Sequence, residues 1–141
     1  MNNYRLLNGY IIFTAAVIFI TTACAGPQRN VLSTERDFQE AFNKVYFNSK
    51  AKLEAPVKYG RVDLLSDDYA IEVDKLDNFH EALGQALHYA KETGRKPAVA
   101  IFILERKPGD REKVKFVMEL CNYYGIKFWF LNEELKKGNK K

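Results

Sequence analysis

The chain has only two cysteines, Cys24 and Cys121, in 141 residues. No intrachain disulfide remains if Cys24 is lipidated or is removed with a leader. Cys121 falls on the apolar side of a helical pattern, which favours a small buried side chain over a nucleophile. The sequence therefore predicts a domain that is held together by its core.

Phosphate-binding glycine loops, internal repeats and low-complexity blocks are also missing from the sequence. His80 and His88 are eight residues apart, and neither has a histidine four residues away, so no helical zinc pair is indicated. The balance of 22 Lys+Arg against 18 Asp+Glu gives a net charge of only +4, which permits a nucleic-acid partner without arguing for one. With 28% charged and 47% hydrophobic residues, the composition is that of a globular domain.

Residues 1–25 have the layout of a secretory signal peptide. A polar head with the single Arg5 precedes an apolar run, Tyr10 to Ile20, which is short for a bilayer span of about 20 residues. Three alternatives stay open: lipidation of Cys24 as in bacterial lipoproteins, cleavage at an A-x-A site, and an uncleaved membrane anchor. All three predict export, either to the bacterial cell envelope or into the medium.

The remaining chain divides into a linker over residues 26–33, a domain over 34–132 and a basic tail over 133–141. Hydrophobic periodicity in the domain predicts the order αβββαβαβ. A helix links the expected strand at 69–74 to the apolar strand at 97–104, and such crossovers make the two strands parallel. The predicted fold class is therefore α/β, with a small mixed β-sheet flanked by helices.

The stretch from residue 61 to 74 predicts a β-hairpin with two aspartates in its turn. This register sets Asp63 opposite Glu72 and Arg61 opposite Asp74. Carboxylates that face each other across a sheet repel, by roughly 4 kcal/mol at about 4 Å and an effective dielectric constant near 20. We therefore expect a bound cation, a shared proton or exposure to water to offset the repulsion.

Strand side chains alternate between the two faces of a sheet. Asp63, Glu72 and Asp74 are therefore expected on one face of the hairpin. The apolar residues expected on the other face are Val62, Leu64, Ile71 and Val73.

Two further polar residues lie on helices expected to pack on the sheet. Glu35 is in the first turn of the helix that starts near Ser33, on the same side as Phe38 and Phe42. Such a carboxylate either belongs to a site or only favours the positive end of the helix dipole. Gln85 is on the next helix and is expected to face the strands. Its amide either orients a water or contacts a phosphate, or it only makes a hydrogen bond to the backbone.

The order of these elements, with Glu35, Asp63, Glu72, Gln85 and Tyr89, resembles the PD-(D/E)xK, or restriction-endonuclease-like, nuclease superfamily over roughly residues 34–131. RVDLLSDDYAIEVD, followed by EALGQALHYAKETGRKPAV, is similar to short uncharacterised bacterial members of it. The resemblance implies a restriction-endonuclease-like core and hydrolysis of phosphodiester bonds in nucleic acid, with DNA favoured over RNA.

The resemblance also implies a metal site and a catalytic set. Asp63 and Glu72 would hold Mg²⁺ or Mn²⁺, with Glu35 reaching the ion directly or through water, since hard cations prefer carboxylate oxygens. Gln85 and Asp74 complete the implied catalytic set.

At position 74, two residues after Glu72, the resemblance calls for a lysine, but the chain has Asp74. Lys75 points to the other face by strand alternation. Either Asp74 pairs with Arg61, or Asp74 is an additional metal ligand and another residue, such as Lys52, supplies the cation. The alternatives to an active nuclease are an inactive nuclease-fold binding module and a structural lipoprotein with a solvated acidic face.

Overall fold

The structure is a computed structural model that describes residues 32–138. The expected signal or anchor segment at residues 1–25, including the candidate lipidation site Cys24, lies outside the described residues. Within residues 32–138 none of the helices combines the length and the apolar character that a bilayer span requires.

Nine regular elements and one 3₁₀ turn make up the described chain, and the expected mixed α/β architecture is confirmed. One five-stranded sheet has the order β1-β2-β3-β4-β5. The first two pairs of neighbouring strands are antiparallel, and the last two, including the expected pair β3–β4, are parallel. The elements are α1 (Glu35–Phe47), β1 (Lys52–Val57), β2 (Gly60–Leu65), β3 (Tyr69–Lys75), η1 (Leu76–Asn78), α2 (Phe79–Thr93), β4 (Lys96–Phe102), α3 (Asp110–Tyr123), β5 (Lys127–Phe130) and α4 (Leu131–Gly138).

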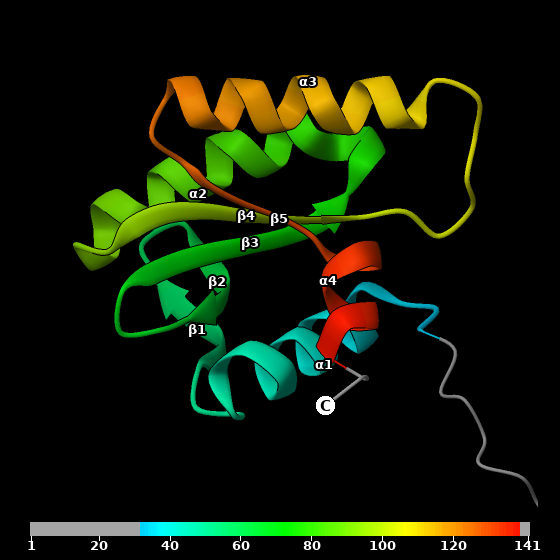
Figure 1. Ribbon diagram of the computed structural model, residues 1–141. Helices are drawn as coiled ribbons and strands as arrows, with labels where there is room; N and C mark the ends of the chain where they lie inside the picture. Colours follow the sequence, from blue (N-terminus) through cyan, green and yellow to red (C-terminus); the bar gives the residue numbers. More distant parts are fainter. Residues whose placement is uncertain (1–31, 139–141) are drawn as a thin grey trace, which may run out of the picture. The chain divides into compact units, whose positions relative to one another are not determined.

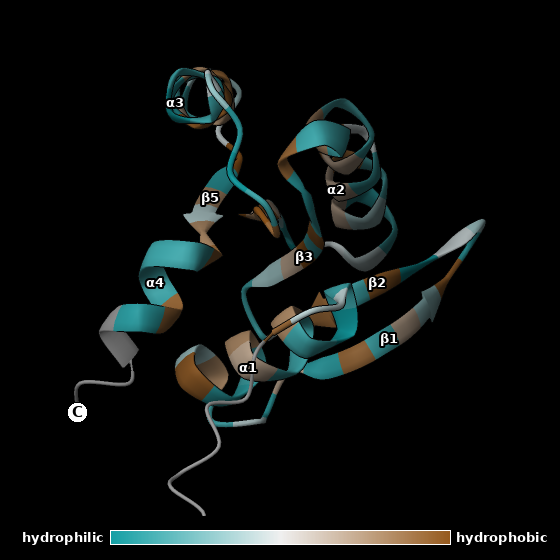
Figure 2. Ribbon diagram, turned by 90° about the vertical axis from the view of Figure 1, so that its right-hand side faces the viewer, coloured by the Kyte–Doolittle hydropathy of each residue, from teal (hydrophilic) through white to brown (hydrophobic). Residues whose placement is uncertain are grey.

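Helices cover both faces of the sheet, α2 and α3 on one and α1 and α4 on the other (Figures 1 and 2). Strand β4 lies between β3 and β5 and supplies side chains to both layers. Val99 and Ile101 belong to the core under α2 and α3, whereas Ala98, Ala100 and Phe102 belong to the core against α1 and α4. A strand buried on both faces requires the continuous apolar run seen in the sequence.

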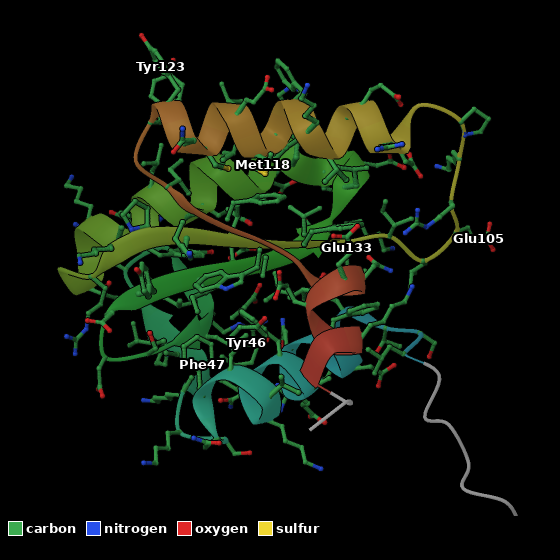
Figure 3. The ribbon with its side chains drawn as sticks, viewed as in Figure 1. Tyr46, Phe47, Glu105, Met118, Tyr123 and Glu133 are labelled. Carbon is green, nitrogen blue, oxygen red and sulfur yellow. The ribbon has the colours of Figure 1, made fainter. Side chains whose placement is uncertain are left out.

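Aromatic side chains attach α1 to the sheet. The ring of Phe38 stacks on an aromatic ring of β4 with the centroids 4.1 Å apart, and Phe42 meets Trp129 of β5 at 5.2 Å. Tyr46 and Phe47 also contact Trp129, and Figure 3 shows them between α1 and the sheet. These contacts hold the helix, and therefore its first turn, in place against the strands.

The sequence predicts no helix after the last strand, yet the chain forms α4. Leu131 and Leu135 are buried in the core that they share with α1. Between them Asn132 donates from Nδ2 to the carbonyl of Ile103 and accepts from its N–H, both at 2.7 Å. Part of the segment expected as a basic tail is thus a helix packed on the end of β4.

Cys121 is fully buried in the core under α2 and α3. Burial raises the pKa of its thiol to about 11. The thiol therefore stays protonated at neutral pH, in line with its interpretation as a small hydrophobic residue.

Candidate functional site

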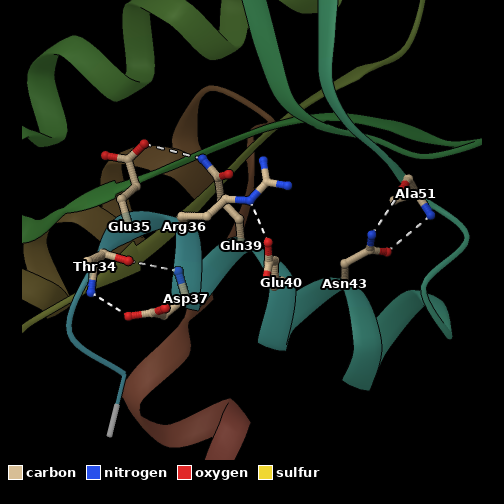
Figure 4. Close-up of polar contacts among 8 residues, drawn as sticks. All are labelled: Thr34, Glu35, Arg36, Asp37, Gln39, Glu40, Asn43 and Ala51. Atoms are coloured by element: carbon tan, nitrogen blue, oxygen red, sulfur yellow. Dashed lines mark hydrogen bonds and ion pairs between the residues drawn. The ribbon is translucent and has the colours of Figure 1, made fainter. Parts of the chain in front are cut away.

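The first turn of α1 places Glu35 (Figure 4). Thr34 Oγ1 accepts a hydrogen bond from the N–H of Asp37, and Asp37 Oδ2 accepts one from the N–H of Thr34 at 2.8 Å, which is a capping box. The backbone N–H groups of Ser33 and Thr34 hold the pKa of Asp37 at about 2. Glu35 itself is exposed, and its Oε1 accepts a bond of 3.2 Å from Nε2 of the buried Gln39.

Strands β2 and β3 pair near their turn, through Leu64 and Leu65 of β2. This is the predicted register, and it carries Asp63 and Glu72 to opposite positions on the two strands. At this point Asp63 Oδ2 accepts a hydrogen bond of 2.7 Å from the N–H of Val73, so a side chain takes the place of the backbone partner. The β1–β2 hairpin separates from β3 beyond Asp63, which leaves room beside Glu72.

Strand β1 contains a residue in a conformation unusual for a strand. Glu54 has φ 51°, in the left-handed region that few non-glycine residues adopt. Its two neighbours in β1 pair with Leu64 and Val62 of β2, so Glu54 lies opposite Asp63. The left-handed residue therefore stands at the fork where the hairpin leaves the sheet.

Two alternate residues of β2 pack in different layers of the core. Leu64 packs with Ile71 and Val73 on the α1 side, but Val62 packs beneath Tyr89 of α2. The expectation that Val62 shares a face with the other three residues is wrong, because it assumed unbroken alternation along β2.

The acids line a cavity of about 420 Å³. Four of the five expected site residues lie around it, and Asp74 does not. The lining residues are Glu35, Glu54, Gly60, Arg61, Asp63, Glu72, Gln85 and Tyr89.

Two of these acids are buried, with Asp63 8% and Glu72 7% exposed. Loss of solvation raises the pKa of Asp63 to about 7 against an opposing backbone hydrogen bond, and the charges of Glu35, Glu54 and Asp74 add to the rise. Loss of solvation, followed by the charge of Asp63, raises the pKa of Glu72 to about 9. Burial and the charge of Asp74 also raise the pKa of Glu35. The cluster therefore resists full ionisation.

One oxygen in the cavity has no partner. Glu72 Oε2 is buried and makes no hydrogen bond within the described residues, and a buried unpaired polar atom costs about 1–3 kcal/mol. No three His, Cys, Asp or Glu side chains in residues 32–138 form a ready-made metal cluster, so the carboxylates would have to draw together around an ion. The unpaired oxygen and the all-carboxylate donor set nevertheless fit Mg²⁺ or Mn²⁺.

Arg61 does not pair with Asp74, which was one of the two alternatives for this aspartate. Its Nε lies 3.2 Å from Glu54 Oε2. Asp74 instead accepts hydrogen bonds from the N–H of Lys75 at 2.6 Å and from Nδ2 of Asn78 at 3.0 Å. The divergence of β2 from β3 explains the difference, because the opposed positions beyond Asp63 are no longer neighbours.

Neither Lys52 nor Lys75 lines the cavity. Lys52 is exposed and pairs with Leu65 at the other end of the hairpin. Lys75 is exposed, and its charge opposes the rise in the pKa of Glu35. Among the described residues that line the cavity, Arg61 is the only basic one.

Glu54 was not predicted as a site residue, and Tyr89 entered only as one of the residues that carry the resemblance. The sequence held a signal for Glu54: if Val57 is paired with Gly60 across the turn, the same register places Glu54 opposite Asp63. Tyr89 follows Gln85 by four residues, which puts both on one side of α2. The left-handed conformation of Glu54 has no signal in the sequence.

We expect Gly60→Ala to destabilise the protein by about 1–3 kcal/mol, since overpacking a tight contact has a cost of that size. A Cβ at position 60 would lie 2.7 Å from both Cε1 and the hydroxyl oxygen of Tyr89, so the ring or the hairpin must move. Urea denaturation measures the effect. The matched control is Gly84→Ala, where a Cβ meets nothing within 4 Å and should stabilise α2. An unchanged midpoint for Gly60→Ala would contradict the contact.

A scan of the chain against protein-family models finds no match. Searches of curated proteins and of solved structures find no match either. The functional interpretation therefore depends on the geometry and charge of the cavity.

Proposed function

We propose that this protein is a metal-dependent, nuclease-like hydrolase of phosphodiester bonds in nucleic acid, similar to the PD-(D/E)xK superfamily and acting on DNA rather than RNA. The observation that carries the proposal is a pair of buried carboxylates at a fork in the sheet, of which Glu72 has an unpaired oxygen. Glu35 from α1 and Gln85 from α2 line the same cavity.

The residues that line the cavity would have different roles in such a reaction. A divalent ion bound there would supply Lewis-acid stabilisation and a water of lowered pKa. Asp63 is held by the N–H of Val73, which leaves its second oxygen as a ligand. Gln85 lines the wall, where its amide donates to a phosphate oxygen or orients the water. Water adds to phosphorus as the bond to the leaving oxygen breaks, which yields a phosphate monoester and a hydroxyl group.

A second candidate is a nuclease-fold module that holds a cation or a partner without turnover. It is favoured by Asp74 at the position where the resemblance calls for lysine, and by the fact that Arg61 is the only basic residue among the described cavity-lining residues. The third candidate, a structural lipoprotein, needs a solvated acidic face. The burial of Asp63 and Glu72 argues against it.

We expect Mn²⁺ to raise the melting temperature of the wild type, and to support nicking of supercoiled plasmid at pH 8. At a hundred times the dissociation constant the ion should stabilise the fold by about 2.7 kcal/mol. Asp63→Asn should lose the thermal shift and at least 99% of the nicking rate, while Glu92→Gln, on an exposed part of α2, should keep both. A thermal shift without nicking would favour the binding module, and no shift would overturn both the nuclease and a module that holds a cation.

Export through residues 1–25 remains part of the proposal, and the membrane is a partner if this segment is lipidated or anchors the chain. Incorporation of radiolabelled palmitate into the wild type, and not into Cys24→Ala, is the expected result for a lipoprotein. If no palmitate is incorporated, the cleaved and the anchored forms remain. Mass spectrometry separates these two, because the cleaved form lacks the mass of the leader.

A further inference from the structure

We propose that Gln39 is a positioning residue for the metal site and holds the Glu35 carboxylate at the cavity through a hydrogen bond. The inference rests on the proposed function, since it needs Glu35 as a ligand of the ion at Asp63 and Glu72. Gln39 belongs to α1 and is not among the residues that line the cavity. Its effect on the ion therefore acts through Glu35.

Glu35 needs a contact that fixes its side chain. It is exposed in the first turn of α1, and a glutamate side chain in solvent must lose rotamer freedom before it can bind an ion in one position. The adjacent cation is already paired, because Arg36 Nε lies 2.6 Å from Glu40 Oε1. Gln39 Nε2 donates to Glu35 Oε1 at 3.2 Å, which leaves Oε2 for the ion (Figure 4).

The hydrogen-bond donor is fixed because Gln39 is buried. Its side chain is 1% exposed, whereas Glu35, one turn earlier on the same face of α1, is in contact with solvent. Close packing restrains a buried side chain, so the amide presents its N–H at one place. Because the amide is neutral, it orients the carboxylate without cancelling the negative charge that attracts a cation. A lysine or arginine at this position would compete with the ion for the same oxygens.

Gln39 is an unfavourable residue for a purely structural role. Its Oε1 is buried and makes no hydrogen bond within residues 32–138, and a buried polar atom without a partner destabilises a fold. Asn43, one turn further along α1, differs: its Nδ2 donates to the carbonyl of Ala51 at 2.9 Å, and its Oδ1 accepts from the N–H of Ala51 at 3.1 Å (Figure 4). Asn43 thus stabilises the fold with both amide atoms, whereas Glu35 is the one partner of the Gln39 amide among the described residues.

The test measures Mn²⁺ binding to the full chain by isothermal titration calorimetry at pH 8, together with the melting temperature without metal. Gln39→Met keeps the length of the side chain and its packing, and removes both polar groups of the amide. We expect it to bind Mn²⁺ about 10–100-fold more weakly, the usual loss when a residue that orients a metal ligand is removed. Its metal-free melting temperature should be no lower than that of the wild type, because an unpaired buried oxygen is removed with the amide.

Two controls separate positioning from packing. Asn43→Ser removes hydrogen bonds to the backbone of Ala51, so it should lower the melting temperature and leave the affinity for Mn²⁺ unchanged. In a Glu35→Ala background, Gln39→Met should cause no further loss of affinity, because the effects of two residues that act through one contact are not additive.

Weaker binding of Mn²⁺ by Gln39→Met, with no further loss in the Glu35→Ala background, would support the role of Gln39. An unchanged affinity of Gln39→Met, a further loss in that background, or an equal loss in Asn43→Ser would overturn this role and leave the proposed function standing. A wild type that binds no Mn²⁺ would overturn both.

Discussion

The metal-free protein is expected to lose at least about 10 °C of melting temperature between pH 5 and pH 9. The pKa values of Asp63 and Glu72 are raised in the fold from 3.8 to about 7 and from 4.5 to about 9. A carboxyl whose pKa is raised by folding stabilises the native state fully below its unfolded pKa, and this contribution is lost as the pH rises through the folded value. The loss reaches about 1.4 kcal/mol per pH unit for each group, and about 1 kcal/mol lowers the melting temperature by about 4–8 °C.

Scanning calorimetry in a chelating buffer measures this slope. Below about pH 4 the opposite trend sets in, because the lowered pKa values of Asp37 and Asp77 make the ionised forms of these groups stabilising. Saturating Mg²⁺ should flatten the decline above pH 6, since the ion replaces protons on the same oxygens. A melting temperature that stays level from pH 5 to pH 9 without metal would contradict the burial and mutual repulsion of the two acids.

Glu72→Gln is expected to raise the melting temperature of the metal-free protein at pH 8 by about 10 °C and to abolish stabilisation by Mn²⁺. The amide resembles the protonated carboxyl in shape and requires no proton uptake on folding. We expect a gain of about 2 kcal/mol, less than the raised pKa of Glu72 implies, because the amide brings donors of its own that need partners.

The pH dependence distinguishes this explanation from a general packing effect. At pH 4.5 Glu72 of the wild type is protonated in the native state and about half protonated in the unfolded state, so the difference in stability between the wild type and Glu72→Gln should become small. Glu92→Gln, a change of the same chemistry at an exposed position, should have no effect at either pH. If Glu72→Gln were less stable than the wild type at pH 8, the unpaired carboxylate would not be a source of strain.

Local sequence patterns were sufficient to predict those parts of the protein in which the hydrophobic residues keep one period throughout an element. The apolar run of β4 and the turn between β2 and β3 predicted strand positions and the register that opposes Asp63 and Glu72. Helical spacing placed Glu35 and Gln85 on the faces from which they line the cavity. These features follow from residues close together in the sequence, or from an unbroken alternation.

The tertiary structure decided everything that depends on a break in a pattern. Glu54 adopts a left-handed conformation, Val62 packs on the α2 side, and Arg61 pairs with Glu54 and not with Asp74. α4 is stable because Leu131 and Leu135 find a shared core with α1. The sequence alone thus determined that Asp63 and Glu72 face one another. The point at which the β1–β2 hairpin leaves the sheet depends on contacts between segments distant in the chain. These are the hydrogen bond that Asp63 accepts from the N–H of Val73 and the packing of the hairpin against α2.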